Sequence, residues 1–199
     1  MNFTSILSQN GTNENNNGSL NLKKNDVLNL TKAAPKLNNC MLAAGWDMIN
    51  YGVDADLDIS AFLLNTNNRC VDTIYYNHMV GQGIELKEDN RTGRGDGDDE
   101  QIMIDLSQIS PSINSIVFNI TIYDAKTRHQ TFGMVKNAYV RLVNIENDTE
   151  ICRYSLTSDF STDTAIIVCS LNRTSTGWEF QAIGEGMVGD LNNLYNKFA

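Results

Sequence analysis

The chain has 199 residues, of which 41% are hydrophobic and 20% are charged. This length suits one domain and this composition is that of a chain that buries a core, which argues against two domains and against wholesale disorder. Acidic residues outnumber basic ones by 24 to 15, so the formal net charge is −9. Such a charge repels phosphate backbones on average, which disfavours nucleic acid as a partner and favours cations.

The N-terminal residues 1–9 lack the basic and continuous apolar segments of a signal peptide. No apolar run approaches the ~18 residues of a membrane-spanning helix, so we expect a cytoplasmic protein without a transmembrane segment. Residues 10–19 are mostly Asn and Gly and have little to bury. The sequence therefore predicts a flexible leader over residues 1–19 and one domain over residues 20–199.

After the leader, short segments with strand character alternate with turn residues. The predicted strands are residues 39–46, 57–65, 71–76, 101–105, 116–123, 138–144, 150–155, 164–171 and 178–184. In segment 116–123 the large apolar side chains fall on every second residue, which predicts one buried face and an exposed Thr121. Helical patterns are limited to a turn at 107–113 and a terminal helix at 190–198. Many short strands without long helices between them predict an all-β fold, an antiparallel β-sandwich with short helical elements.

Two segments concentrate acidic side chains. In the first, VDADLD, three carboxylates occupy alternate positions, and an extended backbone would direct them to one face. The second, DNRTGRGDGDDE, has glycines that let the backbone turn and present carbonyl oxygens. Hard oxygen ligands on a flexible loop favour Ca²⁺ over Mg²⁺, whereas zinc would require Cys or His. The acidic residues of the two segments are Asp54, Asp56 and Asp58, then Asp89, Asp96, Asp98, Asp99 and Glu100.

One acidic, glycine-rich run by itself fits a solvated loop as well as a metal site. Two such runs, separated by a hairpin's length of strand, could converge at one edge of a sandwich, and together they favour the metal site. An EF-hand is excluded, because a count from Asp54 places Ile59 where that loop needs Gly and Asn65 where it needs Glu.

A set of longer motifs occurs in a fixed order from about Leu20 to the C-terminus. They are GWD (45–47), DADLD (54–58), DNRTGRGDGDDE (89–100), IVFNITIYDA (116–125), QTFGMVKNAYVRL (130–142) and WEFQAIGEG (178–186). Together they resemble the TerD family of tellurium-resistance and general stress proteins. The chain departs from the family pattern at Glu88 and Asp190, where the family usually has Gly.

The resemblance implies a calcium-binding β-sandwich that acts in bacterial resistance to tellurite and other stresses. It also implies assemblies with related stress-resistance proteins near the inner face of the membrane. Carried over residue by residue, it implies one or two Ca²⁺ ions held by both acidic segments. The implied metal ligands are Asp54, Asp56, Asp58, Asp89, Asp98, Asp99 and Glu100.

We therefore predict a non-catalytic calcium-binding stress-response protein, in which the ion cancels repulsion between carboxylates and orders both loops into an interaction surface. The alternative is a calcium-dependent adaptor that recruits a membrane or a protein. A metal-dependent hydrolase would need a general base, and the sequence indicates none. Arg128 and Arg141 are expected to pair with buried or loop carboxylates, and Trp46 and Trp178 to pack in the core.

Overall fold

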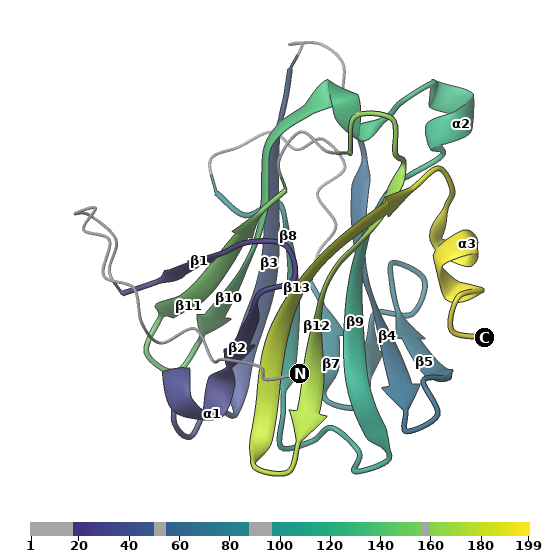
Figure 1. The fold of residues 1–199 in the computed structure, drawn as a ribbon. Helices are drawn as coiled ribbons and strands as arrows, with labels where there is room; N and C mark the ends of the chain where they lie inside the picture. Colours follow the sequence, from purple (N-terminus) through teal and green to yellow (C-terminus); the bar gives the residue numbers. More distant parts are fainter. Residues whose placement is uncertain (1–17, 50–54, 88–96, 157–159) are drawn as a thin grey trace.

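The computed structural model describes residues 18–49, 55–87, 97–156 and 160–199, and in these residues two β-sheets pack face to face (Figure 1). The first sheet has the order β1 (Leu20–Leu22), β11 (Thr149–Ser155), β10 (Val135–Asn144), β3 (Asn39–Met48), β8 (Glu100–Asp105), β7 (Ile84–Leu86) and β6 (Val80–Gly81). The second has the order β2 (Val27–Asn29), β13 (Gly177–Met187), β12 (Ala165–Thr174), β9 (Ile113–Ile122), β4 (Leu57–Asn65) and β5 (Cys70–Ile74). The short helical elements are α1 (Leu30–Ala33), α2 (Ala125–Arg128), the 3₁₀ turn η1 (Phe132–Met134) and α3 (Leu191–Tyr195).

The predicted β-sandwich is confirmed, and each of the nine predicted strands corresponds to an observed one, with ends that differ by a few residues. The remaining strands, β1, β2, β6 and β7, are two or three residues long, too short for alternation to be visible in the sequence. Neighbouring strands pair antiparallel except β1, which runs parallel to β11 with Leu20 opposite Cys152. Residues 1–17 of the predicted leader lie outside the described residues.

The main core lies between the sheets and takes side chains from both, including Leu42 and Val140 from the first and Phe118 and Phe180 from the second. Trp46 and Trp178 are 4% and 7% exposed, which confirms their predicted burial. Cys40, Cys152 and Cys169 are buried free thiols and Cys70 is half-buried.

The prediction of one buried face for the strand 116–123 is wrong, because β9 is buried on both faces. Thr121 is 5% exposed and its neighbours on the same face, Asn119 and Val117, are 0% and 4% exposed. The reason is tertiary: β9 lies between β4 and β12, and the outer face of the second sheet carries a second apolar cluster that α3 covers.

Helix α3 confirms the predicted terminal helix, although it is shorter than residues 190–198. Asp190 accepts a hydrogen bond from the backbone of Asn193, whose side chain accepts one from the backbone of Asp190, so the first turn is capped in both directions. Phe62 meets the ring of Tyr195 edge to face, with 6.1 Å between centroids. No helix in the described part of the chain is long and apolar enough to cross a membrane.

Candidate metal centre

The described ends of the two acidic segments are linked through Glu100. Glu100 opens β8 of the first sheet, and Ile59 belongs to β4 of the second sheet. The Ile59 N–H donates to Oε2 of Glu100 at 3.1 Å, and Glu100 is only 2% exposed. A buried carboxylate of the second acidic segment thus binds the strand that the first acidic segment leads into.

The three consecutive acidic residues before and at the start of β8 take three different partners. Asp98 pairs with Arg141, while Oδ2 of Asp99 accepts the backbone N–H of Trp46 at 2.9 Å. Glu100 reaches across to Ile59. Gly97 has φ +110°, a conformation that suits glycine, so the chain turns just before these three residues.

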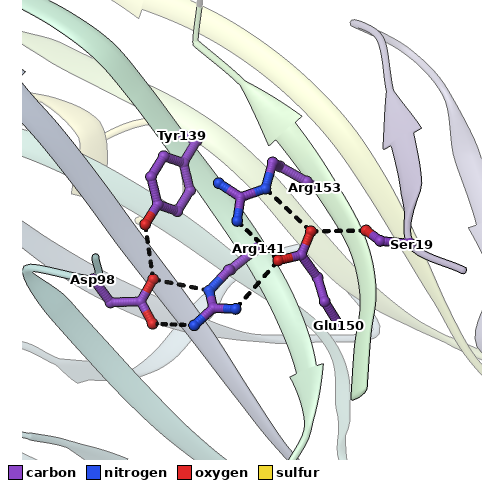
Figure 2. Close-up of polar contacts among 6 residues, drawn as sticks. All are labelled: Ser19, Asp98, Tyr139, Arg141, Glu150 and Arg153. Atoms are coloured by element: carbon purple, nitrogen blue, oxygen red, sulfur yellow. Dashed lines mark hydrogen bonds and ion pairs between the residues drawn. The ribbon is translucent and has the colours of Figure 1, made fainter. Parts of the chain in front are cut away.

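Asp98 is held in a polar network on the first sheet, which Figure 2 shows. Arg141 donates from Nε to Oδ1 at 2.9 Å and from Nη2 to Oδ2 at 2.7 Å, and the Tyr139 hydroxyl donates to Oδ1 at 3.0 Å. The Asp98 side chain is 4% exposed, so this fork-shaped pair is largely removed from water. Both oxygens of Asp98 are therefore already engaged by this chain's own donors.

Glu150 binds the third nitrogen of the Arg141 guanidinium. Its Oε2 accepts from Nη1 of Arg141 at 3.2 Å and from Nη2 of Arg153 at 2.8 Å, and its Oε1 accepts from Ser19 at 2.7 Å. Burial would raise the pKa of Glu150, but the hydrogen bonds from Arg153, Ser19 and Arg141 outweigh it and hold that pKa below its ordinary value. Arg153 also stacks on the Tyr139 ring, 4.0 Å from its centroid.

Gly45, from the GWD motif, makes room for this arrangement. It lies opposite Tyr139 in the β3–β10 pair. A methyl group on Gly45 would lie 2.6 Å from Cζ and from the hydroxyl of Tyr139, and 2.6 Å from the carbonyl oxygen of Gly97. The strand therefore needs glycine here, because the Tyr139 ring and the loop before β8 both press against its backbone.

Asp56 of the first acidic segment lies near two tyrosines that follow strands β5 and β9 of the second sheet. Asp56 is 8% exposed, and its Oδ2 is 3.6 Å from Nη1 of Arg128 in α2. The same guanidinium lies over the ring of Tyr123, 5.2 Å from the centroid. The rings of Tyr123 and Tyr76 meet edge to face at 6.0 Å. Burial raises the pKa of Tyr76, and the charge of Asp58 raises it further.

The donor chemistry of the buried carboxylates fits a hard cation. Asp56, Asp99 and Glu100 offer carboxylate oxygens and are at most 9% exposed. Burial raises the pKa of Asp99; the N–H of Trp46 opposes this, and the charges of Asp47 and Asp98 add to the increase. Burial and nearby negative charges disfavour the ionised form of a carboxylate, and a bound cation stabilises that form. Within the described ranges, however, no three His, Cys, Asp or Glu side chains form a group that could hold a metal ion unaided.

The predicted ligands are thus placed in three ways. Asp54 and Asp89 lie outside the described residues. Asp56, Asp58, Asp99 and Glu100 are among the described residues, where they do not form a group of three that could hold a metal ion. Asp98 pairs with Arg141. The expected pairing of Arg128 and Arg141 with loop carboxylates is confirmed.

Sequence reasoning missed Tyr139, Glu150, Arg153 and Ser19, which complete the Asp98 network. Residues 139 and 141 stand two apart, a spacing that places both side chains on one face of a strand. Their shared partner could not be found this way, because Asp98 is 43 residues away from Arg141.

The chain is similar to known proteins along most of its length. A family model described as TerD domain matches residues 19–198. The tellurium resistance protein TerD of Serratia marcescens is 43% identical over 186 residues, covering 90% of this chain and 97% of that protein. General stress protein 16U of Bacillus subtilis (strain 168) is also 43% identical over 186 residues, covering 90% and 96%. These names describe resistance and stress proteins and state no catalytic activity.

Among solved structures, the fold matches that of a homologue of telluride resistance protein (TerD) from Streptomyces coelicolor A3(2). The TM-score is 0.68 at 24% identity, and the match covers 80% of this chain and 95% of that one. The solved structure supports the fold, while the family model and the closely similar sequences identify the family. The chain belongs to the TerD family of tellurium-resistance and stress-response proteins.

Proposed function

We propose that this protein is a calcium-binding stress-response protein, in which Ca²⁺ held by the two acidic segments orders an interaction surface. The observation that carries the proposal is the 3.1 Å hydrogen bond from Ile59 to Glu100, because it joins the strands that follow the two segments. It supports a shared site because it brings the first residue of β8 to β4, which begins within the first acidic segment.

The described residues that would hold the ion are Asp56, Asp58, Asp99 and Glu100, with Asp54 and Asp89 as further donors. A bound Ca²⁺ would supply a double positive charge and accept six to eight oxygen ligands. Asp99 and Glu100 each have one oxygen hydrogen-bonded to a backbone N–H, which fixes the orientation of the carboxylate. We assign Asp98 an indirect part, since Arg141 and Tyr139 engage both of its oxygens.

Calcium is favoured over magnesium by the type and number of donors. Mg²⁺ requires a near-ideal octahedron and retains several waters, whereas Ca²⁺ accepts many carboxylates in irregular geometry. With two histidines in the chain and three of its cysteines buried in the core, a zinc site of nitrogen and sulfur ligands has little support.

The test is thermal unfolding of metal-stripped protein with Ca²⁺ or Mg²⁺ added. At a free ion concentration of 100 times the Kd, one site adds about 2.7 kcal/mol to the free energy of unfolding. For a domain of this size, that raises the Tm by about 5 to 11 °C. The variants Asp58→Asn and Asp99→Asn should lose most of the calcium-dependent increase.

The matched control is Glu85→Gln, which removes one exposed carboxylate from β7. It should keep the full calcium-dependent increase in Tm. If Ca²⁺ raises the Tm of the wild-type protein no more than Mg²⁺ does, or if all three variants respond equally, the carboxylates are solvated and the calcium proposal fails.

A second candidate is a calcium-dependent adaptor that recruits a membrane. It is favoured by the exposed rings of Tyr76 and Tyr123, 39% and 45% exposed, beside Asp56 and Asp58. Tyrosine suits a membrane interface because its ring is apolar and its hydroxyl polar. Vesicles containing phosphatidylserine should pellet the protein only with Ca²⁺ if this function holds, and should leave it in the supernatant under both conditions if it does not.

A further inference from the structure

The chain approaches β8 through three consecutive carboxylates, and one arginine fixes the first of them. We propose that Arg141 is a positioning residue for the acidic segment: by clamping Asp98, it directs Asp99 and Glu100 toward the metal centre. The predicted effect on calcium affinity rests on the proposed calcium function. The clamp on Asp98 can be tested without calcium.

The geometry of the clamp is that of a planar fork on a carboxylate. Nε and Nη2 of Arg141 contact the two oxygens of Asp98 at 2.9 and 2.7 Å. Two parallel charge-assisted hydrogen bonds fix the plane of the carboxylate as well as its distance, which a lysine ammonium cannot do. The Tyr139 hydroxyl adds a third donor to Asp98 at 3.0 Å.

Arg141 is itself held from the opposite side. Its Nη1 donates to Glu150 at 3.2 Å, and Glu150 is in turn fixed by Arg153 and Ser19 (Figure 2). The side chain of Arg141 is 28% exposed, so it is partly shielded from water. The network therefore anchors the acidic segment to β10 and β11 and leaves the guanidinium little freedom to swing away.

The directions of the Asp99 and Glu100 side chains depend on the position of the backbone at Asp98, which precedes them. One residue after Asp98, Asp99 donates its backbone N–H to Ala44 at 2.8 Å and accepts the N–H of Trp46. One residue further, Glu100 accepts the N–H of Ile59. Loss of the Asp98 clamp would free the backbone immediately before both side chains, and a displacement there would spoil their direction.

The sign of the effect on calcium affinity distinguishes this role from simple electrostatics. If Arg141 acted only as a nearby positive charge, its removal would strengthen binding of a cation. If Asp98 were a direct calcium ligand, Arg141 would compete with the ion for its oxygens. Removal of Arg141 would then strengthen calcium binding as well. A positioning role predicts the opposite, since removal of the groups that orient metal ligands typically weakens metal affinity about 10- to 100-fold.

The experiment measures the calcium Kd of the full chain by isothermal titration with CaCl₂ for Arg141→Gln and Arg141→Lys. We expect Arg141→Gln to weaken binding about 10- to 100-fold. Arg141→Lys, which keeps the charge but lacks the fork, should also weaken it and keeps the test available if the Gln variant folds poorly. An unchanged or tighter Kd in the folded variants would overturn the proposal.

Arg173→Gln is the matched control. Arg173 is also partly buried, stacks on Trp178 at 4.3 Å and donates to Ile109, Ser110 and Ile113, the last of which opens β9. Asp56 of the first acidic segment lies beyond the other end of β9, where its backbone carbonyl accepts a hydrogen bond from the backbone N–H of Tyr123. This variant should lower the Tm yet leave the calcium Kd unchanged, which separates a lost anchor from general destabilisation.

Amide hydrogen exchange without calcium tests the clamp independently of metal binding. The N–H groups of Trp46 and Ile59 donate to Asp99 and Glu100, so both should exchange faster in Arg141→Gln and at wild-type rates in Arg173→Gln. Unchanged exchange in Arg141→Gln would refute the clamp. Faster exchange in a protein whose wild-type form binds no calcium would leave the clamp intact and refute only the calcium function.

Discussion

The substitution Gly45→Ala tests whether the close approach of Tyr139 and Gly97 to β3 holds the acidic segment in place. The added methyl group would lie 2.6 Å from Cζ and the hydroxyl of Tyr139 and from the Gly97 carbonyl. Those separations are about 1 Å shorter than a comfortable contact, so the ring and the loop must both move.

Overpacking of this kind typically costs 1–3 kcal/mol, and the destabilised contact includes the Tyr139 bond to Asp98. For a domain of about 200 residues, we expect a fall in Tm of about 2 to 12 °C, measured by calorimetry in calcium-free buffer. Because φ of Gly45 is not positive, an alanine here suffers from lack of space and not from backbone strain.

A double-mutant cycle with Tyr139→Ala tests whether the Tyr139 ring causes the destabilisation by Gly45→Ala. If the ring causes much of the cost, Gly45→Ala should destabilise the Tyr139→Ala background by distinctly less than it destabilises the wild type. The residual cost then measures the contact with Gly97. Equal costs in the two backgrounds would show that the Tyr139 ring does not press on Gly45, and a fall in Tm below 1 °C in the wild type would show that neither contact is as close as described.

Phe62→Ala should lower the free energy of unfolding in urea by about 3–5 kcal/mol and release α3, because it removes a fully buried ring and its contact with Tyr195; a cost below 1 kcal/mol would show that α3 contributes little. A thiol reagent at neutral pH should label half-buried Cys70 well before the buried Cys40 and Cys152, and early labelling of either buried thiol would contradict their placement. Burial raises the pKa of Cys40 and of Cys152 from 9.0 to about 12, so both stay protonated in the folded state at pH values where the unfolded chain ionises. The stability that the two protonated thiols contribute is complete below pH 9 and is lost as the pH rises through 12. Cys40→Ala should therefore show a smaller decrease in Tm above pH 9 than the wild type. An equal decrease in the two proteins would refute this.

The nine longer strands could be predicted from sequence because each is long enough for apolar alternation and turn residues to appear. For β4 the predicted and observed bounds agree, Leu57–Asn65. The pairing of Arg141 with a loop carboxylate could also be expected, whereas convergence of the acidic segments at one edge stays a prediction. These are properties of local pattern and of charge, both of which a linear sequence displays.

The tertiary structure decided which carboxylate meets which partner. Asp98, Asp99 and Glu100 are adjacent and chemically similar in sequence, yet they bind an arginine of β10, a backbone N–H of β3 and a backbone N–H of β4. Thr121 looked exposed because its strand alternates, yet it is buried, because β9 lies between β4 and β12 and the outer face of that sheet is also covered. Sequence determined the strands and the concentration of charge. Contacts between residues dozens of positions apart depend on how strands are ordered in the two sheets, and only the folded chain fixes that order.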